Sequence, residues 1–593
     1  MRKQMKIAAI ASAAALLAIG ASMTSFAATG WQEEDGTWVY YNKNGEQVTS
    51  TWEKSGDNWF YLDDDGERAV DSLIEDDDDY YYVNSEGAMV RNQWVAVDNE
   101  DAGDDDQPDV WWYYFQSNGK AYRNNHSSNT IFKKVINGKT YCFDEDGKMQ
   151  YGWVDHDDGT TNYDDDAFES CDYYFGDEND GAMAVGWREI ALTDVNDADD
   201  DQPGDSYWDE DQVRWFWFKS SGKKQTNKTN KAINGRKYGF DQYGRMIADW
   251  YIDEGSQSDT LSNLGRRGAK LSTADNASDS NARDYAEEFY YFSSPEDGAR
   301  YTKGWFKVVP GYYLNYEKYD DGDSYWYYAD GDGNIYAGRI KSIKGKKYAF
   351  DLKGGMISGL AVLRVDNTNR IYEYVDDEDL YDTEDNFDDF ASEYIDKDLG
   401  DGTKYEVYYF GDDEDHDGAM KTGTQRLDLD GDSTTFKFEK SGTKKGQGIN
   451  GKDDKKWYHG GKLLAADSDD KIEIINTDEK ADDYLHEYTV SEFINGDGDW
   501  QSPISDGTVK LSTYTLGDGE KRGKAGEDDT TYYIGDDNTK WDLTADADAA
   551  KALKTYKVVN TSGSVVKNGT KKDGDEFKVV VKGEKIQQIY VED

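Results

Sequence analysis

Hydrophobic and polar positions alternate along this chain over short stretches, and each stretch ends at a glycine. Residues 30–52 read GWQEEDGTWVYYNKNGEQVTSTW, and residues 52–70, 80–90 and 112–122 repeat the arrangement. Each stretch places aromatic residues at alternate positions, then three or more polar residues, then a glycine. Alternation with a period of two is typical of a strand, and glycine allows the positive φ of a tight turn. The pattern therefore predicts a succession of β-hairpins.

A longer repeat groups these hairpins into threes. One hairpin of each cycle is rich in Trp, one contains an Ile-Asn-Gly-Lys type of turn (136–149, 233–246, 343–356), and one contains Tyr-Tyr-Phe (172–183, 289–300, 407–420). Trp94, Trp187 and Trp305 open successive cycles, and a fourth cycle begins near Gly423 without its tryptophan. Residues 94–463 are therefore expected to be duplicated three-hairpin units.

A single hairpin is marginally stable in water, so aromatic faces must stack on the next hairpin. The expected fold class is all-β, a β-hairpin solenoid. With the turn glycine at offset +7, tryptophan occupies offset zero at Trp38, Trp59, Trp112, Trp215 and Trp326. Offset +2 is also aromatic: Tyr40, Tyr61, Tyr114, Trp217 and Tyr328. Since these two offsets share a strand face, we expect that face to carry the contacts between hairpins.

The composition narrows the possible partners. The chain has 593 residues with 123 Asp+Glu against 67 Lys+Arg, a formal net charge of −56. Such a chain has no basic surface for phosphates, so we expect no nucleic acid partner. The 14% of aromatic residues argues against a disordered chain. Acidic runs form insertions at 98–109 and 194–205, and further insertions lie at 253–286 and 365–402; we expect all four to be loops on the outside of the solenoid.

The N-terminus has the pattern of a secretory signal. Arg2, Lys3 and Lys6 precede an apolar stretch too short to span a bilayer, and Ala27 ends a cleavage-type triplet. We expect residues 1–27 to be a signal peptide and the mature protein to be secreted without membrane insertion. Cys142 and Cys171 are the only cysteines, and their strand positions place them on opposite faces, so no disulfide is expected between them.

The Gly-Trp-x4-Gly-x-Trp-x-Tyr-Tyr motif at 30–41, the Gly-Ala-Met endings and the repeated returns to Gly-Trp resemble the choline-binding or cell-wall-binding repeats of Gram-positive surface proteins. The Ile-Asn-Gly-Lys hairpins are similar to repeats of glucan-binding proteins and clostridial toxins. The resemblance covers roughly residues 30–463, and residues 556–586 resemble a diverged final repeat.

The resemblance implies a superhelix of hairpins that holds small ligands between consecutive hairpins. Aromatic cages would surround a quaternary ammonium group, which the ring quadrupoles attract. One cage would contain Trp31, Trp38 and Tyr61. A second would contain Trp52, Trp59 and Tyr82, with Met89 nearby.

Three further tryptophan pairs depart from this cage pattern. They are Trp94 with Trp112, Trp187 with Trp215, and Trp305 with Trp326. The next hairpin has Cys142, Gly239 or Ala349 at offset +2, so we expect the third ring to be missing. A tryptophan pair with an open side suits a flat sugar face as well as a cation, and structural packing is the alternative for each ring.

The sequence offers little chemistry for catalysis. The five histidines are scattered, and no nucleophile elbow, zinc-protease motif or phosphate loop is present. Asp428, Asp430 and Asp432 resemble the start of a calcium loop but lack its glycine and distal glutamate, so weakly bound Ca²⁺ and plain solvated loops both remain open. No other cofactor is expected.

These observations predict a signal peptide (1–27), hairpin repeats of the wall-binding type (28–93), three-hairpin super-repeats with acidic insertions (94–463) and a β-rich C-terminal segment (464–593). The expected protein is non-catalytic and attaches non-covalently to choline or polysaccharide of the bacterial cell wall at the cell surface. The alternative is a structural or adhesive surface protein whose acidic loops contact a protein or a host glycan.

Overall fold

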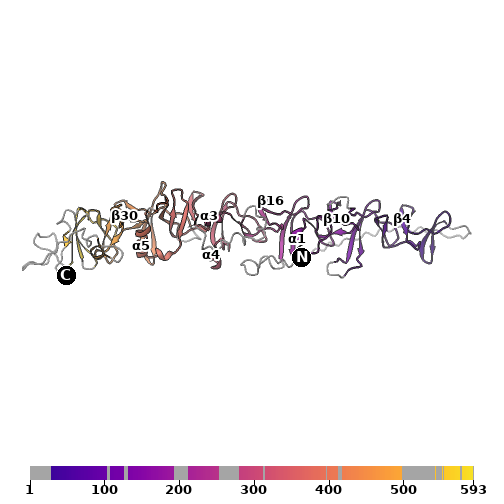
Figure 1. The fold of residues 1–593 in the computed structure, drawn as a ribbon, viewed down its shortest axis with the longest axis horizontal. Helices are drawn as coiled ribbons and strands as arrows, with labels where there is room; N and C mark the ends of the chain where they lie inside the picture. Colours follow the sequence, from indigo (N-terminus) through magenta and orange to yellow (C-terminus); the bar gives the residue numbers. More distant parts are fainter. Residues whose placement is uncertain are drawn as a thin grey trace, which may run out of the picture. The chain divides into compact units, whose positions relative to one another are not determined.

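Short strands dominate the chain and helices are few, which confirms the predicted all-β class (Figure 1). The computed structural model describes residues 29–102, 107–125, 131–192, 212–252, 279–311, 314–395, 397, 399–411, 417–496, 502, 541–542, 551, 553–574 and 577–591. The predicted signal peptide lies outside these residues. No helix within them is both long enough and apolar enough to cross a membrane.

The chain divides into two compact units, of which the first comprises residues 1–196 and 210–225 and the second residues 197–209 and 226–593. The first unit contains β1 (Gly30–Glu34), β2 (Thr37–Tyr41), β3 (Thr51–Ser55), β4 (Asn58–Leu62), β5 (Ser72–Asp76), β6 (Asp79–Val83), β7 (Gln93–Asp98), β8 (Val110–Phe115), β9 (Lys133–Ile136), β10 (Lys139–Phe143), β11 (Met149–Gln150), β12 (Gly152–Val154), α1 (Ala167–Ser170), β13 (Tyr173–Phe175), β14 (Gly186–Leu192) and β15 (Gln212–Phe218).

The second unit begins with the same kind of hairpin. Its elements up to residue 409 are β16 (Lys228–Ile233), β17 (Arg236–Phe240), β18 (Asp249–Ile252), α3 (Asp279–Ala286), β19 (Phe289–Phe292), β20 (Gly304–Val308), α4 (Tyr316–Asp320), β21 (Tyr325–Ala329), β22 (Arg339–Ile343), β23 (Lys346–Phe350), β24 (Leu360–Val365), β25 (Ile371–Val375), η2 (Glu378–Leu380), α5 (Glu384–Tyr394) and β26 (Lys404–Tyr409).

Larger sheets follow in the C-terminal part of this unit. The remaining elements are β27 (Gly423–Leu429), β28 (Asp432–Phe438), β29 (Gly451–Asp453), β30 (Lys456–His459), β31 (Lys462–Leu463), β32 (Ile472–Asn476), β33 (Glu487–Tyr488), α7 (Val490–Asn495), β34 (Trp541–Asp542), β35 (Tyr556–Asn560), β36 (Asn568–Lys572), β37 (Phe577–Lys582) and β38 (Lys585–Val591). Sheets of three to five strands, such as β27-β28-β31-β30-β29 and β34-β38-β37-β36, replace the two-stranded ribbons here.

Two turns, a tight turn between the strands and a return turn after the second strand, fix the backbone of each hairpin. In the first, Trp31 of β1 lies opposite Tyr40 of β2, and both residues of the tight turn, Asp35 and Gly36, have positive φ. The return turn is capped by a side chain, because Asn42 Oδ1 accepts from the amides of Asn44 (2.8 Å) and Glu46 (3.0 Å). The same cap recurs at Asp63, Asn84, Asp241, Asp330 and Asp351. Part of the high acid content therefore serves to fix turns.

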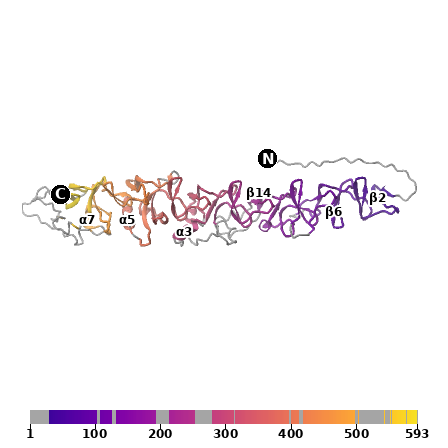
Figure 2. The same cartoon turned by 90° about the horizontal axis from the view of Figure 1, so that it is seen from above.

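A recurring backbone hydrogen bond joins many of the hairpins to the one before it. The residue two positions after the turn glycine donates its amide to the carbonyl at offset zero of the preceding hairpin; we call this the link bond. Figure 2 shows the ribbon of the region around β2 and β6. There the link bonds join Arg68 to Trp38 (2.7 Å), Met89 to Trp59 (2.8 Å) and Ala121 to Tyr80 (2.8 Å). Met183–Thr140, Lys224–Asp172, Arg300–Lys237, Met356–Trp326, Met420–Lys347 and Gly448–Val407 repeat it.

The two faces of each hairpin meet different neighbours, which changes the predicted packing. Offsets +1 and +3, not zero and +2, hold the most deeply buried rings, such as Phe115, Phe216 and Phe350 at 0% exposure. They pack against the offset zero and +2 rings of the preceding hairpin, as Tyr141 and Phe143 do against Trp112 and Tyr114. The predicted face thus provides one side of each interface, and the opposite face of the next hairpin provides the other.

The insertion at 365–402 is not the outer loop that was expected. Residues 371–375 form β25, which pairs with β24, and residues 384–394 form α5. Phe387, Phe390 and Ala391 recur at helical spacing and are buried against β26 to β28. The expectation was wrong because these apolar residues are hidden within a segment whose overall composition is acidic.

The two cysteines are free and buried, as predicted, although not for the predicted reason. Cys142 lies in β10, whereas Cys171 caps the C-terminus of α1 and is not a strand residue. Burial raises the pKa of the Cys142 thiol to about 12, which keeps it protonated.

The C-terminal segment has a core of its own and is β-rich, as expected. Ile474, Val558 and Val579 from three strands pack with Phe493 of α7. Val559 and Val565 form the isolated bridge seen at the return turns of the repeats, in the region expected to be a diverged repeat.

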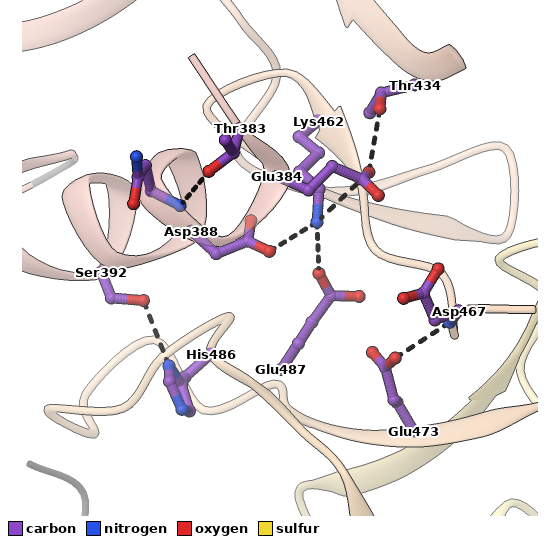
Figure 3. Close-up of polar contacts among 11 residues, drawn as sticks. Thr383, Glu384, Asp388, Ser392, Thr434, Lys462, Asp467, Glu473, His486 and Glu487 are labelled. Atoms are coloured by element: carbon purple, nitrogen blue, oxygen red, sulfur yellow. Dashed lines mark hydrogen bonds and ion pairs between the residues drawn. The ribbon is translucent and has the colours of Figure 1, made fainter. Parts of the chain in front are cut away.

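A buried ionic cluster fastens α5 to this part of the second unit (Figure 3). The ammonium of Lys462, whose side chain is 5% exposed, lies 2.6 Å from Asp388 Oδ2 and 3.0 Å from Glu487 Oε2. Nearby, Glu473 Oε1 accepts from the amide of Asp467 at 3.0 Å. Burial, followed by repulsion from Glu487, raises the pKa of Glu473 to about 9. Glu473 is therefore protonated in the folded protein at neutral pH.

The packing of a turn glycine against the preceding hairpin can be tested at Gly119. Gly119 and Gly36 both have a φ of +89°, but a Cβ at Gly119 would meet the sulfur of Met89, whereas a Cβ at Gly36 would meet nothing within 4 Å. Gly36→Ala should carry only the backbone cost, about 1–2 kcal/mol. Gly119→Ala should lower the free energy of unfolding by about a further 1–3 kcal/mol through overpacking. Urea denaturation followed by circular dichroism measures both.

Adding Met89→Ala should remove the excess cost of Gly119→Ala and leave that of Gly36→Ala unchanged. Equal losses from the two glycine variants would contradict the packing of Met89 on Gly119.

The proton on Glu473 makes stability depend on pH. A glutamate titrates near pH 4.3 when unfolded but near 9 in the folded protein, so the folded state binds more protons between these values. The free energy of unfolding should therefore fall as pH rises from about 5 to 9, and Glu473→Gln should remove this part of the dependence. The slopes of the free energy of unfolding against pH should differ between wild type and Glu473→Gln by at most about 1.4 kcal/mol per pH unit. The variant Glu479→Gln, at an exposed position, is the control. Parallel profiles of the free energy of unfolding against pH for wild type and Glu473→Gln would refute the prediction.

Candidate aromatic binding slots

Each candidate site is built around the tryptophan that opens a hairpin; we call the site a slot. The slot tryptophan contacts a ring of its own hairpin at offset +2 and a ring of the next hairpin at offset +1. Trp31 lies 5.3 Å from Tyr40 and 5.3 Å from Phe60 between ring centroids, at interplanar angles of 69° and 71°. Rings at these angles meet edge to face and enclose a corner, whereas the rings of a flat stack lie parallel.

The slot at Trp52 adds a carboxylate to the same arrangement. Trp52 lies 5.1 Å from both Tyr61 and Tyr81, at 61° and 58°. Its indole Nε1 donates to Asp76 Oδ2 at 3.1 Å. Burial, followed by the charge of Asp76, raises the pKa of Tyr61 and keeps the phenol neutral. The slot therefore combines three ring faces with one negative charge.

The structure regroups the rings of the two predicted cages. Tyr61 lies against Trp52 and not against Trp31, and Tyr82 lies 6.1 Å from Phe115 in the following interface. Adjacent residues of a strand point to opposite faces, so a cage cannot take its third ring from offset +2 of the next hairpin. Phe60 and Tyr81, at offset +1, occupy that place instead.

The other predicted cage residues lie beside the slots. Trp38 and Trp59 are half-buried, and their carbonyls accept link bonds. The ammonium of Lys54 lies 6.0 Å from the ring centroid of Trp59. Met89 covers the turn glycine of the next hairpin, Gly119.

The expectation of a missing third ring is wrong for two of the predicted sugar slots. Trp94 contacts Tyr114 at 5.2 Å and Tyr141 at 4.8 Å. Trp305 contacts Tyr328 at 5.1 Å and Tyr348 at 4.8 Å. The residue at offset +1 provides the ring, so Cys142 and Ala349 at offset +2 do not leave the slot open.

The tryptophans at offset zero add polar donors to these slots. Trp187 lies 6.1 Å from Trp215, and Trp305 lies 6.3 Å from Trp326. The indole N–H groups of Trp112 and Trp326 are buried with no acceptor among the described residues. An unsatisfied buried donor is costly, so a ligand hydroxyl at these positions would be favourable.

Two slots were not predicted, and both are filled by the protein itself. Trp153 contacts Tyr174 and Phe216, and the ammonium of Lys224 lies 5.5 Å from its ring centroid. Lys224 also donates to the carbonyls of Phe168 and Glu169, so this slot holds an internal cation. The Gly-Trp pair at 152–153 was the available signal for it.

The second unpredicted slot, at Trp250, has no such pair because Asp249 precedes the tryptophan. Trp250 is 6% exposed and packs 4.8 Å from Tyr327, and its Nε1 donates to the carbonyl of Val309 at 2.8 Å.

One of the three weak calcium candidates, Asp428, caps a turn. Asp428 Oδ1 accepts from the amide of Gly431 at 2.7 Å in the β27–β28 turn, which also contains Asp430 and leads to Asp432. Within the described part of the chain, no group of three His, Cys, Asp or Glu residues is placed to hold a metal ion. The geometry therefore gives the calcium expectation no support.

Comparisons with known proteins find similarity to a choline-binding repeat. A family model of the choline-binding repeat matches residues 48–94, which contain the Trp52 slot. Glucosyltransferase-S of Streptococcus mutans serotype c is 29% identical over 370 residues, covering 57% of this chain but 22% of that protein. This chain therefore matches less than a quarter of its relative.

Solved structures from Streptococcus pneumoniae show distant similarity. Choline binding protein F, solved in the presence of a peptidoglycan analogue, is 16% identical with a TM-score of 0.30, covering 71% of this chain and 99% of that one. The modular autolysin LytC, in complex with a synthetic peptidoglycan ligand, is 16% identical with a TM-score of 0.28, covering 57% and 55%. The resemblance to the choline-binding repeat is confirmed by the family model, which matches residues 48–94.

Proposed function

We propose that this protein is a secreted, non-catalytic surface protein that attaches non-covalently to the bacterial cell wall through its aromatic slots. The observation that carries the proposal is the Trp52 slot, which lies within the matched repeat at residues 48–94. There, Trp52, Tyr61 and Tyr81 meet at 5.1 Å beside the carboxylate of Asp76.

This arrangement suits choline in particular. A quaternary ammonium has no N–H to donate, so it is held by ring faces and by nearby negative charge. The indole–Asp76 hydrogen bond fixes the tryptophan and the carboxylate together. Several weak slots on one chain would give strong retention on a wall that displays many copies of the ligand.

A glycan is the second candidate ligand. The buried, unpartnered indole N–H groups of Trp112 and Trp326 suit hydroxyl groups better than an ammonium. The similarity to a glucosyltransferase supports a glucan as this ligand. The alternative of adhesion through acidic loops rests on insertions such as 194–205, which lie outside the described residues.

The Trp52 slot can be tested with charge-matched ligands. Trp52→Ala should weaken choline binding at this slot by about tenfold or more, because a desolvated cation–π contact is worth about 2 kcal/mol. Isothermal titration of the full chain with choline, and with its neutral isostere 3,3-dimethylbutanol, measures this. Trp111→Ala, which alters a tryptophan outside the slots, is the control. Equal binding of the two ligands, or competition by soluble glucan alone, would refute the choline assignment.

The Trp153 slot allows the converse test, in which a substitution should create a choline site. Lys224→Met should remove the internal cation and add about one choline site per chain, since methionine occupies the same position at Met183 and Met246. The choline stoichiometry measures the change. Lys223→Met, which removes a neighbouring surface cation paired with Asp172, should leave it unchanged. An unaltered stoichiometry in Lys224→Met would show that Lys224 does not fill a ligand position.

A further inference from the structure

Three segments of the second unit bring four cations to one cavity. Arg283 comes from α3, Arg339 and Lys341 from β22, and Arg370 from the turn between β24 and β25. Backbone bonds fix the segments, since Ile340 donates to the carbonyl of Asn369 at 3.0 Å and Ile371 to that of Gly338 at 2.8 Å. The cavity has a volume of about 340 Å³, which falls within the range of small-ligand sites.

The charge of this cavity is opposite to that of the chain. Arg339 and Arg370 are direct cross-strand partners, a pairing of like charges that destabilises a sheet. Asp284 pairs with Arg283 at 3.0 Å, and Glu287 pairs with Arg339. The residues that line the cavity include four cations and one carboxylate, Asp284. Glu287, Asp330 and Asp366 lie next to Arg339, Lys341 and Arg370 from outside the lining. The lining itself is therefore net positive in a protein whose formal charge is −56.

Buried donors in this cavity also lack acceptors. The side chain of Arg283 is 2% exposed, and its Nη1 has no hydrogen-bond partner among the described residues. The same holds for Nε of Arg370. A buried guanidinium donor without an acceptor is costly, so the site is incomplete as the described residues provide it.

The backbone makes room for this arrangement at Gly338. A Cβ there would come within 2.6 Å of Arg283 Cδ, so the absence of a side chain lets Arg283 lie across the start of β22. Gly338 also has a positive φ of +55°.

We propose that this cavity binds an oxyanion of the phosphate class, either free phosphate or the phosphate group of a phosphoester. Guanidinium groups from three segments present donors from different directions, which suits a tetrahedral anion with several oxygens better than a planar carboxylate. The site shares no residue with the aromatic slots, so its occupancy is independent of choline or glycan binding.

Titration of the full chain with inorganic phosphate, glycerol phosphate and acetate tests the proposal. Phosphate should bind at one saturable site, and glycerol phosphate should bind at least as tightly if the ligand is an ester. Arg370→Gln, at a half-buried position that should not impair folding, and Arg283→Gln should each weaken phosphate binding by about ten- to a hundredfold. Arg236→Gln, which alters an exposed arginine of the same unit, should have no effect.

Choline binding should be unchanged in all three variants, which separates this site from the slots. Acetate binding as tightly as phosphate, no saturable phosphate binding by the wild type, or equal affinities in Arg370→Gln and Arg236→Gln would each overturn the proposal. The relative affinities of free phosphate and glycerol phosphate distinguish the two sources of this group.

Discussion

The packing of one hairpin face on the opposite face of the next is the constraint on which the rest of this structure depends. A two-stranded ribbon buries too little surface to persist alone, so each ribbon needs a neighbour on both sides. The slot tryptophan joins two ribbons, as Trp94 does through Tyr114 of its own hairpin and Tyr141 of the next. Where a link bond is present, as between Met89 and Trp59, one backbone contact fixes the register of the two ribbons.

The same contacts that hold the hairpins together create the candidate sites. The interfaces that contain a slot tryptophan bring inclined rings to one corner, but the surroundings of the corner differ. At Trp52 the neighbour is the carboxylate of Asp76, at Trp153 it is the ammonium of Lys224, and at Trp250 close packing fills the space. A repeated fold can thus carry slots of different character without a change in its backbone.

Charge plays three separate roles in this acidic chain. Aspartates such as Asp63 and Asp351 cap turns through their carboxylate oxygens. In the second unit, Lys462 gathers buried carboxylates and fastens a helix to the C-terminal sheets. The cavity at Arg283 and Arg370 concentrates positive charge that the other residues of its lining do not fully compensate.

The sequence by itself determined the hairpins, their turns and the positions of most slot tryptophans, because alternation, turn glycines and Gly-Trp pairs are local signals. Only the tertiary structure decided which rings meet. Phe60 and Tyr61 are neighbours in the chain yet contact tryptophans of different hairpins, Trp31 and Trp52. Which face of a ribbon meets its neighbour is set by packing across the interface, and local periodicity contains no information on that choice. The cavity at Arg283 likewise joins segments nearly ninety residues apart, which no local pattern connects.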